Sequence, residues 1–172
     1  MTFQLTEPIL LIGLGGVGVS LAEKAKKSLN SDCLMISHDQ KDLTAENSIK
    51  ISTKSVVNPS THLIRGSTLE TSDEIKKNIA NYSTVILISN LAGKAGVGIG
   101  PIVSRICKQE QKNLLSFAIM PFKFEKERIF QSGIALKRIR QDSQCTIVVD
   151  NDALLDSNPD LTQKQCYDIS NK

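Results

Sequence analysis

The chain has 172 residues, 40% of them hydrophobic and 23% charged, a composition typical of one folded domain and incompatible with wholesale disorder. Its 21 basic and 18 acidic residues are mixed along the sequence and give a net charge of +3, so no basic stripe indicates nucleic-acid binding. No apolar run approaches the roughly 18 residues that cross a bilayer, so we expect no membrane insertion.

Four cysteines, at positions 33, 107, 145 and 166, show no Cys-x-x-Cys spacing. Cys33 and Cys145 lie in apolar runs, which favours reduced, buried thiols over a metal site. The first residues lack a basic leader and a cleavage site, so they do not resemble a secretory signal. We therefore expect a cytoplasmic protein.

Short continuous apolar runs recur along the chain and predict strands. They are rich in Ile, Leu and Val without alternation, a pattern typical of strands covered on both faces in parallel sheets. The predicted strands are Pro8–Gly13, Cys33–Ser37, Thr84–Ser89, Leu114–Met120 and Cys145–Asp150.

Amphipathic stretches separate these runs and predict helices. In the first of them, Val17, Leu21, Ala25 and Leu29 are spaced four residues apart, with charged residues between them. Strand–helix alternation predicts an α/β fold, with a Rossmann-like layered sheet, mostly parallel, and helices on both faces. The predicted helices are Val17–Leu29, Thr71–Ala80, Ile99–Lys112, Glu125–Gln141 and Pro159–Lys172.

The interval Asn47–Ser67 departs from this alternation. It offers a short strand at Ile49–Ile51 and is otherwise polar, with Pro59, Gly66 and several Ser and Thr residues. We interpret it as a long functional loop or an irregular sheet edge. Residues 1–172 then form a single nucleotide-binding domain that ends in the helix predicted at Pro159–Lys172.

The first glycine motif, Gly13-Leu-Gly-Gly-Val-Gly18, follows a predicted strand and opens a predicted helix. Without Cβ atoms the turn is tight, and its N–H groups can face an anion at the positive helix end. Asp39 follows Gly18 by 21 residues, as in dinucleotide-binding folds where an acid binds ribose hydroxyls. The motif favours a phosphate-bearing ligand over an empty tight turn.

A second glycine-rich segment, Ala92–Gly100, follows another strand and precedes another helix. It is not a P-loop, because Lys94 is followed by Ala95 and Ile88 stands where the first glycine should be. A dinucleotide fold needs only one phosphate loop, so two loops favour a polyphosphate held from two sides. The alternative is that these glycines serve helix packing alone.

Three weaker patterns follow the later strands. One is Pro121–Arg128, another is Asp150-Asn151-Asp152, and the third pairs Tyr167 with Asn171 four residues later, on one helix face. An aromatic ring with an amide one turn away can stack on a base and recognise its edge.

Taken in this order, the segments resemble the nucleotide-binding domain of the tubulin/FtsZ family. Six segments carry the resemblance: two phosphate loops, an acid-bearing loop, a PFxFEG-like segment, an asparagine segment and the aromatic–amide pair. They are Gly13–Gly18, Ala92–Gly100, Ser37–Asp39, Pro121–Arg128, Asp150–Asp152 and Tyr167 with Asn171.

The resemblance implies GTP or GDP as the ligand, with Mg²⁺ as a candidate companion ion. It assigns no catalytic residue and no metal-ligating side chain. The nearest candidate for the third loop, which senses the γ-phosphate, is Arg65–Ser67. The implied ligand-binding residues are Gly15, Gly16, Val17, Gly18, Asp39, Gly66, Gly93, Lys94, Ala95, Gly96, Val97, Gly98, Pro121, Glu125, Arg128, Asn151, Tyr167 and Asn171.

The sequence also departs from the family pattern. Val97 and Ile99 stand where the family's GTGTG signature has threonines, so hydroxyl donors near the phosphates are expected to be lost. The chain ends at Lys172, before the family's acidic hydrolysis loop and second domain. We therefore expect a guanine-nucleotide-binding domain of a cytoskeletal or cell-division protein, with little or no hydrolysis by this chain alone.

In the family, nucleotide lies between stacked subunits and couples its state to head-to-tail polymerisation, which implies self-association here. Two alternatives stay open. One is a Rossmann-type NAD- or ATP-dependent enzyme, and the other is a degenerate, nucleotide-free assembly protein. Whether the chain is an enzyme is left open as well.

Overall fold

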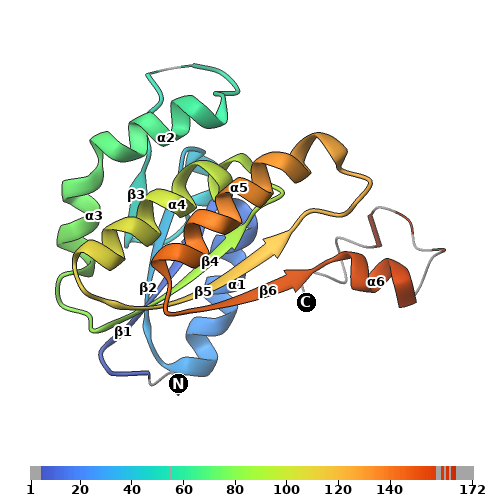
Figure 1. Ribbon diagram of the computed structural model, residues 1–172. Coiled ribbons are helices and arrows are strands. Elements are labelled where there is room, and N and C mark those ends of the chain that lie inside the picture. The colour runs from blue at the N-terminus through green and yellow to red at the C-terminus, as the bar shows by residue number, and fades with distance from the viewer. Residues whose placement is uncertain (1–4, 55, 158–159, 161, 163, 166–172) are drawn as a thin grey trace.

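The computed structural model describes residues 5–54, 56–157, 160, 162, 164 and 165. Its centre is a six-stranded sheet in the order β3-β2-β1-β4-β5-β6, in which every pair of neighbours is parallel (Figure 1). This topology confirms the predicted α/β fold. The strands are β1 (Ile9–Leu14), β2 (Asp32–Ser37), β3 (Ser48–Lys50), β4 (Thr84–Asn90), β5 (Asn113–Met120) and β6 (Cys145–Asp150).

Helices cover both faces of the sheet, as predicted. α1 packs on one face, while α2, α3, α4 and α5 lie on the opposite side, with α4 against both α2 and α5 (Figure 1). A 3₁₀ turn, η1 (Gln40–Asp42), follows β2. The helices are α1 (Gly15–Leu29), α2 (Thr61–Glu70), α3 (Ser72–Ile79), α4 (Lys94–Gln109), α5 (Lys126–Asp142) and α6 (Asp152–Ser157).

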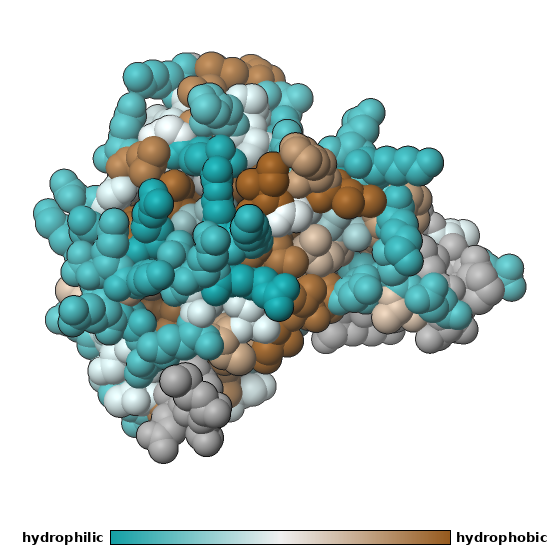
Figure 2. Space-filling model, in the orientation of Figure 1, coloured by the Kyte–Doolittle hydropathy of each residue, from teal (hydrophilic) through white to brown (hydrophobic). Residues whose placement is uncertain are grey.

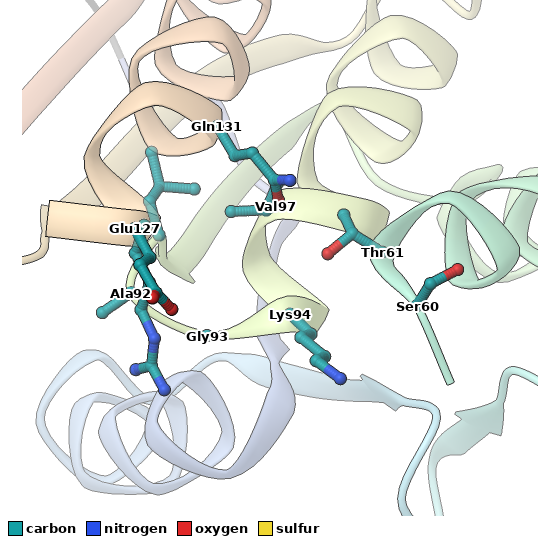
Figure 3. A pocket seen from close by; sticks show the side chains of 10 residues that line it. Ser60, Thr61, Ala92, Gly93, Lys94, Val97, Glu127 and Gln131 are labelled. Carbon is teal, nitrogen blue, oxygen red and sulfur yellow. The ribbon is translucent and has the colours of Figure 1, made fainter. Parts of the chain in front are cut away.

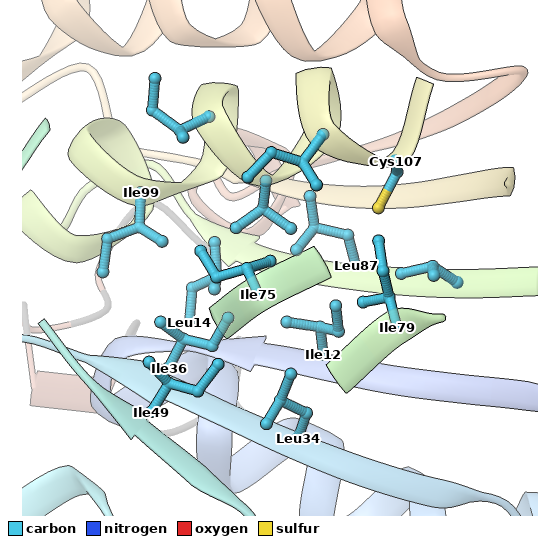
Figure 4. Packing of buried hydrophobic residues seen from close by; sticks show 14 of the residues in the cluster. Ile12, Leu14, Leu34, Ile36, Ile49, Ile75, Ile79, Leu87, Ile99 and Cys107 are labelled. Carbon is cyan, nitrogen blue, oxygen red and sulfur yellow. The ribbon is translucent and has the colours of Figure 1, made fainter. Parts of the chain in front are cut away.

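The main hydrophobic core lies between the sheet and the helices α2, α3 and α4. Alternate residues of the strands, such as Ile12 and Leu34, point towards Ile99 of α4 and Ile75 of α3, and all four side chains are fully buried (Figure 4). Each such side chain contributes about 1.5–3 kcal/mol when buried. This core fixes α4 in place, and with it the segment that leads from β4 into α4.

The order of strands reverses between β1 and β4. The chain leaves β1 towards α1 on one face and leaves β4 towards α4 on the other. In open parallel sheets, the crevice outside the carboxyl ends of two such strands is the usual ligand site. Both glycine motifs therefore lie at the same crevice.

The interval Asn47–Ser67 was predicted as a long loop or an irregular sheet edge; β3 does lie at the edge of the sheet, and the loop prediction is wrong from Thr61 onwards. β3 is present, but the interval also contains the first turns of α2, which begin at Thr61. Ser60 caps this helix, accepting a hydrogen bond from the Leu63 amide at 3.2 Å. The helix was missed because its apolar positions are sparse and several of its residues are Ser, Thr and Gly, which are weak helix formers.

Two other helix predictions concern the helix after the second glycine motif and the helix at the end of the sequence. α4 begins at Lys94, earlier than predicted, so Gly96, Gly98 and Gly100 lie within the helix. The helix predicted at Pro159–Lys172 lies almost entirely outside the described residues.

Among the residues described, no helix combines the length and apolarity that a membrane span requires.

Gly13, in β1, has no room for a side chain. A Cβ atom there would lie 2.5 Å from the Gly18 carbonyl oxygen and 2.9 Å from Ala22 Cβ, so α1 would have to move away from the strand.

We expect Gly13→Ala to lower the free energy of unfolding by about 1–3 kcal/mol. Gly133→Ala is the matched control. Its added Cβ meets nothing within 4 Å, and it should raise the stability of α5 by about 0.5–1 kcal/mol. Urea denaturation measures both, and equal effects would contradict the steric argument.

Tyr82 connects the approach to β4 with the start of β2. Its hydroxyl donates a hydrogen bond to Asp32 Oδ2 at 2.6 Å, and this bond, with partial burial, raises the pKa of Tyr82 to about 12. Because the folded-state pKa lies above the usual 10.0, the stabilisation is present below that pH and is lost as the pH rises towards 12.

We expect Tyr82→Phe to lower the free energy of unfolding by about 0.5–1 kcal/mol near neutral pH. The substitution should have no effect as the pH approaches 12. A difference that stays constant in denaturation curves across this range would overturn the assignment.

Candidate functional site

The two glycine motifs meet at the crevice between β1 and β4. Gly15, which has a φ of +67°, lies so near α4 that a Cβ atom on it would be 2.8 Å from Ala95 Cβ. A cavity of about 190 Å³ opens beside this contact. It is lined by Leu14, Gly15, Gly16, Val17, His38, Asp39, Asp42, Asn90, Gly93, Lys94, Ala95 and Gly96. We call it the glycine cleft.

Two helix N-termini face the glycine cleft. The N-cap residues of α1 and α4 are Leu14 and Gly93, and neither makes a side-chain capping hydrogen bond. Neither helix has an acidic residue in its first turn. The positive ends of both helix dipoles are therefore directed at one small space, an arrangement suited to an anion.

Lys94 stands at the mouth of the glycine cleft. Its Nζ donates hydrogen bonds to Asn58 Oδ1 at 2.7 Å and to the Pro59 carbonyl oxygen at 3.1 Å. The lysine thereby connects the segment before α2 to the start of α4. A cation held by two neutral acceptors keeps its full charge available to an anionic ligand.

The opposite wall of the cleft is acidic. The Ser37 hydroxyl donates to Asp42 Oδ2 at 2.6 Å and accepts a hydrogen bond from the Asp39 amide at 3.1 Å. The Asp39 carboxylate caps η1, accepting from the Lys41 amide at 3.0 Å. Desolvation lowers the pKa of His38, although Asp39 and Asp42 oppose this, and its buried Nδ1 has no hydrogen-bond partner in the described part of the chain.

A second cavity, of about 390 Å³, adjoins the glycine cleft and shares Gly93 and Lys94 with it. Figure 3 shows Ser60 and Thr61 of the α2 start on one side and Glu127 and Gln131 of α5 on the other. Val97 and Arg128 also line it. The start of α2, rather than Arg65–Ser67, is thus the part of the Asn47–Ser67 interval that borders the site.

Some predicted glycines lie outside both cavities. A Cβ on Gly18 would be 2.8 Å from the Ile88 carbonyl oxygen, and one on Gly98 would be 2.9 Å from Ile64 Cγ2, so both permit close packing. Gly66 lies in the middle of α2, where an added Cβ meets nothing within 4 Å. Ile99 is fully buried in the main core. The expectation that Ile99 replaces a phosphate-facing hydroxyl is therefore wrong.

Pro121, Glu125 and Asn151 lie beyond the ends of β5 and β6, and they line neither cavity. Glu125 accepts a hydrogen bond from the Phe122 amide at 2.8 Å and pairs with Arg128 at 3.2 Å. The Lys123 amide donates to Asp152 Oδ1 at 3.0 Å, which joins the two segments.

Asn151 is 4% exposed, and its Oδ1 has no hydrogen-bond partner within the residues that the structure describes. Such an atom can recognise a ligand donor. The predicted residues Tyr167 and Asn171 lie outside the described residues.

Several residues that line these cavities were not among the predicted ligand contacts, and His38, Asp42, Asn90 and Thr61 are four of them with polar side chains. For Thr61 a signal was present, since Asn58-Pro59-Ser60 combines a turn with a helix cap. Asp42 had no such signal, because it reaches the first glycine motif only through the fold of η1.

The cleft fits the phosphate end of a nucleotide. Gly15 and Gly16 bring bare backbone to the cavity where Cβ atoms would meet Ala95 and Asp42. The volume is below the usual range for whole ligands, so it suits phosphate groups and not a complete nucleotide. Within the part of the chain that the structure describes, no three acidic, histidine or cysteine side chains gather closely enough to hold a metal ion.

Comparison with known proteins agrees with this geometry. The model of the Tubulin/FtsZ family, GTPase domain, matches residues 8–159. FtsZ 1 from Halobacterium salinarum, a cell division protein, is 30% identical over 105 residues, covering 60% of this chain and 26% of that protein. The cell division protein FtsZ of Aquifex aeolicus is 29% identical over 101 residues, covering 58% of this chain and 28% of that protein.

Solved structures share the fold. An empty FtsZ dimer from M. jannaschii superposes with a TM-score of 0.85 at 23% identity, covering 95% of this chain and 50% of that one. TubZ of Clostridium botulinum phage c-st superposes with a TM-score of 0.67 at 18% identity, covering 95% of this chain and 55% of that one. The chain thus spans about a quarter of these sequence relatives and half of these structures. Since the family model matches most of its length, the chain belongs to the Tubulin/FtsZ family and carries the GTPase domain.

Proposed function

We propose that residues 1–172 form the guanine-nucleotide-binding domain of an FtsZ- or tubulin-like cell-division or cytoskeletal protein. The observation that carries the proposal is the convergence of two uncapped helix N-termini and Lys94 on the glycine cleft. A dinucleotide enzyme needs one phosphate loop, whereas here both strands at the crevice supply one. Family membership independently favours GTP and GDP as the ligands.

The phosphates would be bound by backbone N–H groups of Gly15, Gly16 and Gly96, assisted by Lys94. Mg²⁺, when bound, would neutralise part of the negative charge of the phosphates. Asp39 is the proposed ribose contact. Asn151 is the proposed guanine contact, because its buried Oδ1 has no partner among the described residues. Tyr167 and Asn171 are proposed to complete the base site.

We further propose that nucleotide lies at a junction between copies of the protein, so that its state controls head-to-tail assembly. Apolar side chains are exposed at the start of α5 and in the segment before α2, two parts of the chain that also contribute residues to the second cavity. Phe130 is 77% exposed and Val57 is 93% exposed. Figure 2 shows apolar patches amid the hydrophilic surface on this side of the molecule. Little or no hydrolysis is proposed for this chain alone, since the family completes its hydrolytic site between subunits.

Nucleotide competition tests the ligand. We expect a fluorescent GTP analogue, bound in the presence of Mg²⁺, to be displaced by GTP and GDP but not by equal concentrations of ATP or NAD. Preferential displacement by NAD or ATP would support a Rossmann-type enzyme instead. Binding of none of them by a folded protein would support a nucleotide-free assembly relative.

Substitution of Lys94 tests the phosphate site. We expect Lys94→Ala to weaken GDP binding about tenfold or more, because a charge-assisted contact to phosphate is lost. Lys77→Ala is the control, since Lys77 is exposed on α3 and lines neither cavity. Calorimetric titration measures both proteins. Equal affinities for the two variants would place the phosphates elsewhere.

A further inference from the structure

Asp42 approaches the first glycine motif from outside it. A Cβ atom on Gly16 would lie 2.9 Å from Asp42 Oδ1, so the carboxylate rests directly against the backbone at the start of α1. Asp42 ends η1, whereas Gly16 lies in the first turn of α1. The contact therefore joins two segments that are distant in sequence, and both line the glycine cleft.

The carboxylate is held in this position. The Ser37 hydroxyl donates to Asp42 Oδ2 at 2.6 Å, and Ser37 itself is fully buried at the end of β2. The Asp39 amide fixes the serine in turn, donating to its hydroxyl oxygen at 3.1 Å. Asp42 makes no ion pair with any described residue, while Lys94 is bonded to Asn58 and Pro59.

A carboxylate at a helix N-terminus occupies a favourable electrostatic position, the same one that a phosphate group would take. α1 has no acidic residue in its own first turn, so Asp42 supplies the negative charge there. A phosphate that approaches Gly16 meets this charge at short range, in a half-buried setting where repulsion is screened less than in water. His38, Asp39 and Lys94 are the other ionisable groups that line the cleft.

We propose that Asp42 is a built-in competitor of the nucleotide phosphates, held by Ser37 against Gly16, and that it lowers the affinity of the glycine cleft for nucleotide. The inference rests on the proposed function, because it assumes that phosphate binds at this cleft. Binding then requires the carboxylate to turn away from α1 or to be neutralised. The strength of the Ser37–Asp42 bond thereby sets how readily the site loads.

The test is GDP binding to the whole chain, measured by titration calorimetry with Mg²⁺ in excess. Asp42→Asn keeps an acceptor for the Ser37 hydroxyl but removes the charge, and we expect about tenfold tighter binding. Ser37→Ala frees the carboxylate without removing it, and should tighten binding about two- to threefold. Glu70→Gln, which removes one charge from the exposed end of α2, should leave the affinity unchanged.

Repeating the GDP titrations at several salt concentrations distinguishes an electrostatic effect of Asp42 from a structural one. The difference between the native chain and Asp42→Asn should shrink at high ionic strength, because salt screens repulsion between carboxylate and phosphate. Thermal denaturation confirms that each variant is folded. Since Ser37 is fully buried, the substitution of the half-buried Asp42 by Asn carries the test if Ser37→Ala unfolds.

Two outcomes overturn the inference alone. Equal affinities for the native chain and Asp42→Asn would show that the carboxylate does not compete. Weaker binding by Asp42→Asn in Mg²⁺ would show that it assists the ligand, as a carboxylate that binds the metal would. If neither protein binds GDP or GTP, the proposed function fails and this inference fails with it.

Discussion

The close approach of α1 and α4 at the carboxyl ends of β1 and β4 is the constraint on which the rest of the site depends. It exists because Gly13 and Gly18 let α1 lie against the sheet and because Gly15 touches Ala95 across the crevice. A single Cβ at Gly13 would collide with backbone, and backbone cannot move aside as a flexible side chain can. The two positive helix ends are therefore held together by packing of both helices against the sheet, which the glycines permit, and not by any attraction between them.

Charged groups of both signs surround the point where α1 and α4 meet. Helix dipoles make the floor of the cleft positive, and Lys94 adds a cation whose position is set by the segment before α2. On the other wall, Asp39 and Asp42 supply two carboxylates, of which one caps its own turn and the other rests against α1. The cleft thus has one positive and one acidic side, and its affinity for an anion depends on how close the bound anion lies to each.

The glycines of the second motif serve two purposes that look alike in sequence. Gly93 and Gly96 lie at the cleft, whereas Gly98 and Gly100 admit Ile64 and Ile139 against α4. Close packing accounts for Gly98 and Gly100, and Gly96 also needs it, because a Cβ atom there would collide with the Asn90 carbonyl group. Likewise Ile99, in a position that seemed to face phosphates, belongs to the core, because α4 starts at Lys94 and turns that side chain towards the sheet.

The sequence by itself determined the fold class, the parallel sheet and the placement of both glycine motifs at strand ends, because apolar runs and their alternation with amphipathic stretches are local patterns. It also identified the glycine cleft, since parallel strands end at one edge. Only the tertiary structure decided which side chains share that cleft. His38 and Asp42 reach it through the end of β2 and through η1, and Thr61, at the start of α2, lines the adjoining second cavity. The distances that join these residues depend on how separate segments pack, which no local pattern encodes.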